Sequence, residues 1–262
     1  MWGVSERDQV AMAMLHTEGV KHPVNSSVIG RLLEEVSWDG VNVRAYRDGG
    51  RGRENVLTAE VLSPLSFLPR DTFLGELLRH AHGPGDVCAR VAAEVEDADI
   101  TLLPDELVLG PQGIKVQPDA QLISPNCYVM VEAKRIRRSS FQTEQLAREY
   151  VALLTAAGRK LPLLFLILSG PPPLAVKGHG RLGIHEAVSL RLADVLARTD
   201  GQAGSFETLA ARIPDVFAWV TWDEVRTLVS AGRDAFRDAP AGLDRTVERL
   251  CEAVTTAIHW HS

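Results

Sequence analysis

Residues 116–150 read VQPDAQLISPNCYVMVEAKRIRRSSFQTEQLAREY, and this stretch decides the expected fold. Asp119 stands on one predicted strand, and Glu132 and Lys134 stand two positions apart on the next. Because side chains alternate faces along a strand, Glu132 and Lys134 point the same way. The turn-forming residues 124–126 predict a hairpin that brings Asp119 beside Glu132. Two carboxylates and one amine are therefore expected to converge on one face.

This convergence predicts a metal site. Burying two acids without partners would be costly, so a positive partner is expected. Magnesium typically binds one or two protein carboxylates together with water and phosphate oxygens. The residues alone therefore predict a phosphodiester-cleaving site with Mg²⁺ or Mn²⁺ as its cofactor.

The spacing of Pro118-Asp119 and Glu132-Ala133-Lys134 resembles the motif of the PD-(D/E)XK nuclease superfamily. A match to those five residues alone is weak, because such residues are common. The order of strand, turn, strand and helix around them makes the resemblance much stronger. It implies an α/β protein with a restriction-endonuclease-like fold, in which a mixed central sheet is flanked by helices.

The helix expected over residues 141–157 extends the resemblance, which covers roughly residues 54–170. Many family members carry Gln and Tyr on this helix with three residues between them. Here four residues separate Gln145 from Tyr150. Gln145 is therefore taken as a site residue and Tyr150 is not.

The resemblance also implies a role for each motif residue. Asp119, Glu132 and the backbone carbonyl of Ala133 would bind the metal ion. Lys134 would orient the attacking water or stabilise the pentavalent phosphorus, and Gln145 would position Lys134 or that water. The implied activity is Mg²⁺-dependent hydrolysis of DNA.

A glutamate on an early helix often completes the metal site in this family. The ENVLTAEVL stretch, residues 54–62, resembles that helix. Glu54 is the first choice for the role and Glu60 the second, with Glu34 and Glu35 behind them. Glu54 is accordingly predicted as a catalytic and metal-binding residue.

Basic residues lie beside the predicted site in sequence. Arg135, Arg137 and Arg138 directly follow the predicted catalytic strand, and Arg51 and Arg53 lie in a glycine-rich loop. Guanidinium groups bind phosphate oxygens strongly, so these five residues are expected to contact the nucleic-acid backbone. A solvated surface is the alternative interpretation for each group.

Composition limits the remaining possibilities. The net charge of −6 argues against a protein that is basic overall, so nucleic-acid binding must depend on a local patch. The three cysteines lack metal-ligand spacing, which favours reduced thiols in a cytoplasmic protein. The longest apolar run is too short to cross a membrane. We expect an N-terminal helical segment, residues 1–45, packed on a nuclease-like domain, residues 46–262, as one compact unit.

Further elements follow from periodicity and turn chemistry. A first helix is expected to be broken by proline, at Pro64 or Pro69, a second over residues 72–81 to be capped by Asp71, and residues 91–95 to form a strand. The other expected elements are a hairpin of residues 107–109 and 114–116, a buried strand over 161–168, a helix over 185–198, a strand over 215–220, and helices over 221–229 and 242–258.

Two other functions remain open on the sequence alone. The chain could be a catalytically silent nuclease-fold subunit that binds nucleic acid or a partner protein, which its acidity favours. It could also be a metal-dependent enzyme that acts on RNA or on a small phosphoester, because nothing in the sequence separates RNA from DNA. A partner protein, a homo-oligomer and a role in defence against foreign DNA are further hypotheses.

Overall fold

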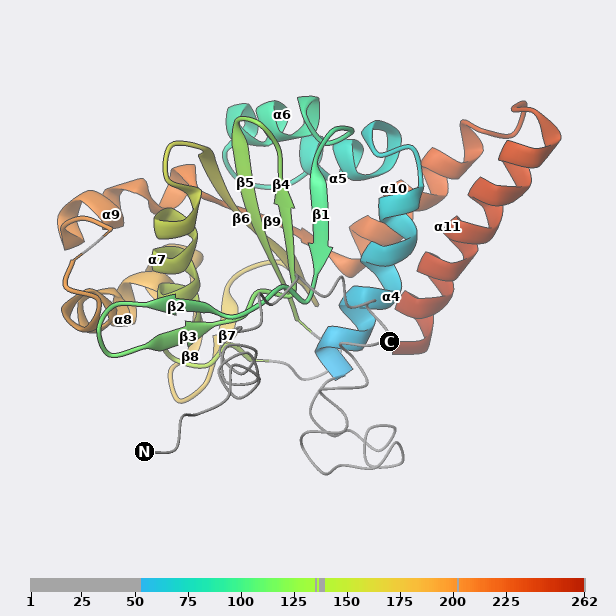
Figure 1. Ribbon diagram of the computed structural model, residues 1–262. Coiled ribbons are helices and arrows are strands. Elements are labelled where there is room, and N and C mark those ends of the chain that lie inside the picture. The colour runs from blue at the N-terminus through green and yellow to red at the C-terminus, as the bar shows by residue number, and fades with distance from the viewer. Residues whose placement is uncertain (1–52, 135, 137–139, 202, 262) are drawn as a thin grey trace, which may run out of the picture.

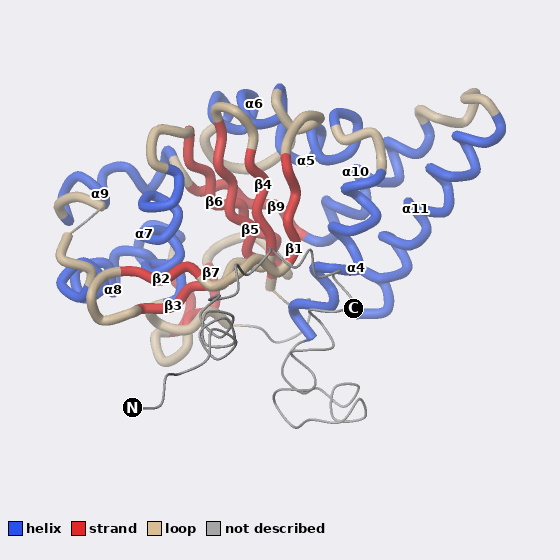
Figure 2. Tube along the Cα trace, in the orientation of Figure 1, coloured by secondary structure: helices blue, strands red, loops and turns tan. Residues whose placement is uncertain are grey.

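The computed structural model describes residues 53–134, 136, 140–201 and 203–261 (Figure 1). It confirms an α/β architecture in which a mixed five-stranded sheet lies between two layers of helices. Figure 2 shows the strands of this sheet as the central layer. The expected N-terminal segment, residues 1–45, lies outside the described residues.

The sheet has an antiparallel half and a parallel half. Its strands, in spatial order, are β1 (Asp99–Leu102), β4 (Ala120–Ile123), β5 (Cys127–Ala133), β6 (Leu161–Leu168) and β9 (Phe217–Thr221). β1, β4 and β5 pair antiparallel, whereas β5, β6 and β9 pair parallel. Two small hairpins lie outside this sheet: β2 (Leu107–Leu109) with β3 (Ile114–Val116), and β7 (Leu174–Val176) with β8 (Gly180–Leu182).

Helices cover both faces of the sheet (Figure 1). One face packs against α7 (Gln145–Ala157), α8 (Ile184–Arg198), α9 (Phe206–Arg212) and the 3₁₀ turn η2 (Ile213–Asp215). The other packs against α4 (Arg53–Phe67), η1 (Asp71–Gly75), α5 (Glu76–Arg79), α6 (Gly85–Ala93), α10 (Trp222–Asp234) and α11 (Ala241–His261).

The continuous apolar run of residues 161–168 forms β6, which is covered on both faces. Leu163, Phe165 and Ile167 belong to the core under α4 and α10, whereas Leu164 and Leu166 belong to the core under α7 and α8. A strand covered on both faces needs apolar side chains at every position. The predicted buried strand over residues 161–168 is therefore confirmed.

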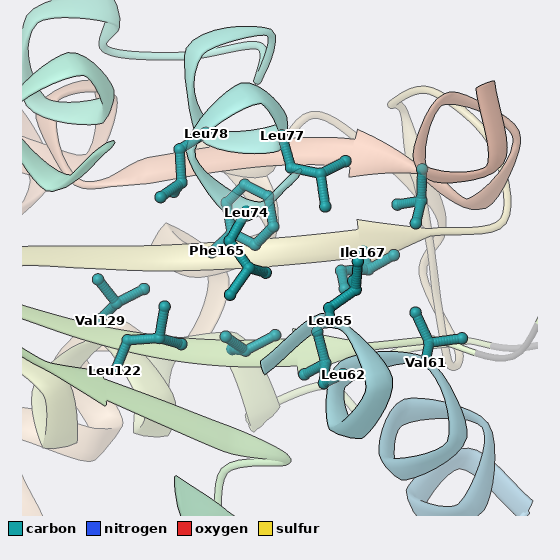
Figure 3. Close-up of a pocket in the computed structure, with 12 residues that line it drawn as sticks. Val61, Leu62, Leu65, Leu74, Leu77, Leu78, Leu122, Val129, Phe165 and Ile167 are labelled. Carbon is teal, nitrogen blue, oxygen red and sulfur yellow. The ribbon is translucent and has the colours of Figure 1, made fainter. Parts of the chain in front are cut away.

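The core under α4 and α5 encloses a small void of about 20 Å³. Its lining is entirely apolar, and Figure 3 shows Leu65 and Leu77 directed toward Phe165 and Ile167 across it. A void of this size without polar partners does not hold an ordered water. This face of the sheet therefore contributes packing, and the void offers no polar group to a ligand.

Of the two prolines expected to break the first helix, Pro64 does not, because α4 continues through it and ends at Phe67, before Pro69. Proline removes one helical hydrogen bond, which normally ends a helix. Here the neighbouring side chains of Val61 and Leu65 are fully buried, and α4 packs along α11. Tertiary packing thus offsets the local cost.

Residues 71–79 are helical as predicted, as η1 followed by α5, but the predicted cap by Asp71 is wrong. Asp71 is the first residue of the π-helical turn η1, and its carboxylate pairs with Arg79 instead of capping the chain. The predicted strand over residues 91–95 belongs largely to the end of α6. Cys88, Val91, Ala92 and Val95 are all buried, and this i, i+3, i+4, i+7 spacing is that of a helix face.

Most of the later elements agree with prediction. The β2–β3 hairpin, α8, β9, α10 and α11 are all present near their expected bounds. Thr221 and Glu224 form the expected capping box at the start of α10. The sequence analysis missed β1, the β7–β8 hairpin and α9.

The turn between β4 and β5 is held from outside the sheet by Glu94. Its carboxylate accepts hydrogen bonds from the Ser124 hydroxyl at 2.5 Å, the Asn126 side-chain amide at 2.9 Å and the Asn126 backbone N–H at 3.1 Å. These bonds, that of Ser124 first, lower the pKa of Glu94 from an ordinary 4.5 to about 2. The charged form of Glu94 therefore favours this turn.

We expect Glu94→Gln to destabilise the fold in a pH-dependent way. A depressed pKa contributes stability above the unfolded value of 4.5 and loses it as pH falls toward 2. Urea unfolding midpoints of wild type and variant should therefore differ most near neutral pH and converge as pH falls through this window. A difference that is constant from pH 7 to pH 2 would contradict the role of the charge. Glu252→Gln, at an exposed position on α11, is the matched control.

Candidate active site

The β4–β5 hairpin places Asp119 opposite Glu132. Ala120 pairs with Val131 in the antiparallel register, so the next positions outward are Asp119 and Glu132. The Asp119 backbone N–H donates to the Val131 carbonyl at 3.1 Å, and Asp119 Oδ2 accepts from the Ala133 N–H at 2.7 Å. The predicted hairpin is confirmed, and its register places Asp119 opposite Glu132 as expected.

Glu132 and Lys134 lie on the same face of β5, as alternation predicts. Lys134 Nζ is 2.8 Å from Glu132 Oε1, and both side chains are less than a tenth exposed. Cys127, Val129 and Val131 face the opposite core. Two charges this deeply buried are tolerated because they pair with each other and with further hydrogen-bonding groups.

Gln145 joins these two charged residues. It is the first residue of α7, so the start of that helix places its amide above the end of β5. Gln145 Nε2 donates to Glu132 Oε1 at 2.6 Å, and Lys134 Nζ donates to Gln145 Oε1 at 3.1 Å. The amide therefore holds the acid and the amine in one fixed arrangement.

Aromatic residues complete the surroundings of Lys134. Its amine lies 4.7 Å from the centre of the Phe141 ring, and its carbonyl accepts a 2.6 Å hydrogen bond from Trp222 Nε1. Its backbone N–H donates to the Ile167 carbonyl at 2.8 Å, which extends the β5–β6 ladder. These contacts fix both the backbone and the side chain of Lys134 where β5 ends.

The sequence analysis missed Glu149, a buried carboxyl next to this cluster. Glu149 is one helical turn after Gln145 on α7 and is 4% exposed, and its Oε2 has no hydrogen-bond partner among the described residues. Burial above all, and then the charge of Glu132, raises its pKa well above the ordinary value, although Lys134 opposes this. The i, i+4 spacing from Gln145 was the signal that it shares that residue's face.

Tyr150 serves the core. Its side chain is fully buried, its hydroxyl donates to the Leu209 carbonyl at 2.9 Å, and its ring lies 5.5 Å from that of Phe217. Burial raises the pKa of Tyr150 to about 12. Tyr150, five residues after Gln145, therefore contacts α9, whereas Glu149, four residues after Gln145, shares the helix face of that residue.

The remaining predicted site residues fall partly outside the described residues. Arg51, Arg135, Arg137 and Arg138 lie outside them, as do Glu34 and Glu35. Arg53 and Glu54 form the first turn of α4, but their side chains also lie outside the described part. Glu60 is exposed on the same helix and lies 3.0 Å from His261 Nε2 of α11.

The donor set at the hairpin fits a hard divalent cation. Across the described ranges no group of three or more His, Cys, Asp or Glu side chains could hold a metal ion. Asp119 and Glu132 instead supply two carboxylates at adjoining positions of neighbouring strands. Two carboxylates match the usual share that a protein contributes to magnesium.

A cavity of about 410 Å³ opens beside Lys134. Phe141 and Leu168 form part of its wall, and Pro173 and Arg181 line it from the loop and hairpin that follow β6. Its size is that of a small-molecule pocket. Lys134 therefore joins the buried charged cluster to a space that a small ligand can enter.

Comparisons with protein-family models, curated proteins and solved structures found no match to this chain. Among the described helices, none has the length and apolar character needed to cross a bilayer.

We expect Glu149→Gln to stabilise the protein at alkaline pH. A carboxyl with a raised pKa favours the folded state below its unfolded pKa, and this contribution is lost as pH rises toward the folded pKa. The amide keeps the shape and removes the titration. Thermal midpoints measured in EDTA should therefore favour the variant increasingly above pH 4.5, whereas Glu252→Gln should follow wild type. A variant advantage that does not grow with pH would contradict this assignment.

Proposed function

We propose that this chain is a metal-dependent nuclease of the PD-(D/E)XK type, with a restriction-endonuclease-like fold, that hydrolyses phosphodiester bonds in DNA. The observation that carries the proposal is the arrangement of Asp119 opposite Glu132 with the Lys134 amine 2.8 Å from Glu132. The mixed sheet between two helical layers is compatible with that fold.

Asp119, Glu132 and the Ala133 carbonyl would hold Mg²⁺ or Mn²⁺ at the end of β5. When bound, such an ion supplies a water of lowered pKa and positive charge against the phosphate. The Ala133 N–H fixes one oxygen of Asp119, which orients that carboxylate before any ligand arrives. Glu54 is proposed to complete the metal site from the first turn of α4.

Lys134 is proposed to contact the attacking water or the phosphate. Its amine is held by Glu132 and Gln145 on one side and by the Phe141 ring on another. Burial of the amine in this setting strengthens its interaction with negative charge that develops on the phosphate. Gln145 acts through Lys134 and Glu132, so it is a positioning residue.

Phosphate binding away from the metal is assigned to basic side chains. Arg135, Arg137 and Arg138 follow Lys134 directly in sequence, and Arg51 and Arg53 precede α4 or begin it. In a chain of net charge −6, such local groups must supply the attraction to the DNA backbone. An acidic nuclease of this kind fits a role in defence against foreign DNA under the control of a partner protein.

A catalytically silent subunit is the second candidate function. The observation that favours it is that Lys134, Glu132 and Gln145 already bind one another, so these groups are engaged within the protein. Such a subunit would bind nucleic acid or a partner protein through the same face without cleaving a bond.

We expect Asp119→Asn, Glu132→Gln and Lys134→Met to abolish cleavage of naked DNA in Mg²⁺ or Mn²⁺, with a loss of at least about 100-fold for Lys134→Met. Calorimetry should show that the two carboxylate variants also lose metal binding, while Lys134→Met retains it. Circular dichroism must confirm folding, because these residues are buried.

Glu106 and Lys115 offer a matched control, since they form an exposed ion pair of 2.6 Å at the β2–β3 hairpin. Glu106→Gln and Lys115→Met should cleave like wild type. Equal cleavage by all five variants and wild type would remove the proposed site. Metal-independent DNA binding without cleavage by wild type would favour the silent subunit.

Gln145→Leu should lower cleavage by about 10- to 100-fold, because outer-shell partners typically contribute this much. Gln142→Leu, at an exposed position three residues earlier, is its control and should leave the rate unchanged. The comparison is made under single-turnover conditions with saturating metal. An unchanged rate for folded Gln145→Leu would show that the amide does not position the site.

A further inference from the structure

The cavity beside Lys134 is built from three parts of the chain. Lys134 and Phe141 lie at the end of β5 and before α7, Leu168 ends β6, and Pro173 and Arg181 belong to the loop and hairpin that follow. All of them lie at the end of the sheet where the charged cluster is found. A group that enters this cavity therefore occupies a space that Lys134 lines.

The β7–β8 hairpin is firmly attached to the site. The Phe141 N–H donates to the Ala175 carbonyl at 2.9 Å, and the Lys177 N–H donates to the Phe141 carbonyl at 2.9 Å. The Thr143 hydroxyl adds a 3.0 Å bond to the Lys177 carbonyl. The cavity wall is thus formed before a ligand binds, which lowers the ordering cost of binding.

The lining combines apolar and cationic groups. Leu168, Pro173 and Leu174 provide apolar surface, while the lining residues Lys134 and Arg181 carry positive charge. A flat base needs apolar contact on its faces, and its phosphate needs a cation. This combination fits a nucleotide better than it fits an uncharged apolar ligand.

The volume sets the form of nucleic acid that fits. About 410 Å³ lies within the range of pockets for one small organic ligand, so the cavity accommodates a single nucleotide. A base of an intact duplex would have to leave its helix to enter, which costs unpairing and unstacking energy. An unpaired base enters without that full cost.

We propose that the cavity beside Lys134 receives one unpaired nucleotide next to the scissile phosphate, so that single-stranded DNA is the substrate class. The claim that single-stranded DNA is cleaved rests on the proposed nuclease function. The claim that the cavity binds one unpaired nucleotide rests on the volume and lining of the cavity.

The test measures binding without cleavage. Full-length protein in EDTA is titrated into a fluorescent single-stranded DNA oligonucleotide and, separately, into the blunt duplex of the same sequence. The expected dissociation constant is about tenfold lower for the single strand, which is the effect of one base held by stacking or apolar contact. An RNA strand of the same sequence forms a third arm, and tighter binding of RNA would overturn DNA as the substrate.

Two cavity variants locate the effect. Ser169→Trp fills the cavity from an exposed rim position, and Arg181→Gln removes a cation from its lining. Both should weaken single-strand binding about tenfold and leave duplex binding unchanged. Ala253→Trp and Arg249→Gln, at exposed positions of α11, are the matched controls and should bind like wild type.

The outcomes separate the two proposals. Cavity variants that bind single strands like wild type, or a wild type that prefers duplex, would overturn the cavity inference even if Asp119, Glu132 and Lys134 prove necessary for cleavage. Weakened single-strand binding by the cavity variants, together with no metal-dependent cleavage by wild type, would support the cavity and overturn the nuclease.

Discussion

The 2.7 Å hydrogen bond from the Ala133 N–H to Asp119 Oδ2 secures the arrangement on which the site depends. It joins the end of β5 to the residue before β4, at the position where the two acids face each other. A slip of one residue in this register would send Glu132 and Lys134 into the opposite core. Glu94, which holds the turn at the other end of the hairpin, protects the same register.

Burial gives the charged cluster its chemical character. Glu132 and Lys134 are nearly inaccessible to water, so each depends on the other and on Gln145 for compensation. Glu149 lies in the same region, and its raised pKa reflects the cost of adding another negative charge there. The cluster therefore places three acids, Asp119, Glu132 and Glu149, around one amine, and burial drives Glu149 toward its neutral form.

The two faces of the sheet differ in chemical character. The face under α4, α5 and α10 is packed with apolar side chains, and its small void is lined by apolar residues throughout. The face under α7 and α8 carries the charged cluster at one end of an otherwise apolar core. α7 links both functions, since Gln145 contacts the cluster while Tyr150, little more than one turn later, anchors the core against α9.

Errors in the sequence analysis arose where short apolar runs or single residues had to decide the structure. Residues 91–95 have strand composition, but their helical phase becomes clear only when Cys88 is included. Pro64 locally opposes a helix, yet burial of its neighbours against the sheet and α11 overrides that preference. Asp71 has the chemistry of a cap, but Arg79 takes its carboxylate.

The sequence by itself determined the β4–β5 hairpin, the pairing of Asp119 with Glu132, and the shared face of Glu132 and Lys134. These follow from strand alternation and a short turn, which are local properties. The tertiary structure alone decided the burial of Glu149, the contact of the buried Tyr150 side chain with α9, and the cavity beside Lys134. Each of these depends on how α7 and the β7–β8 hairpin pack on the sheet, and contacts between segments distant in the chain are not encoded in local spacing.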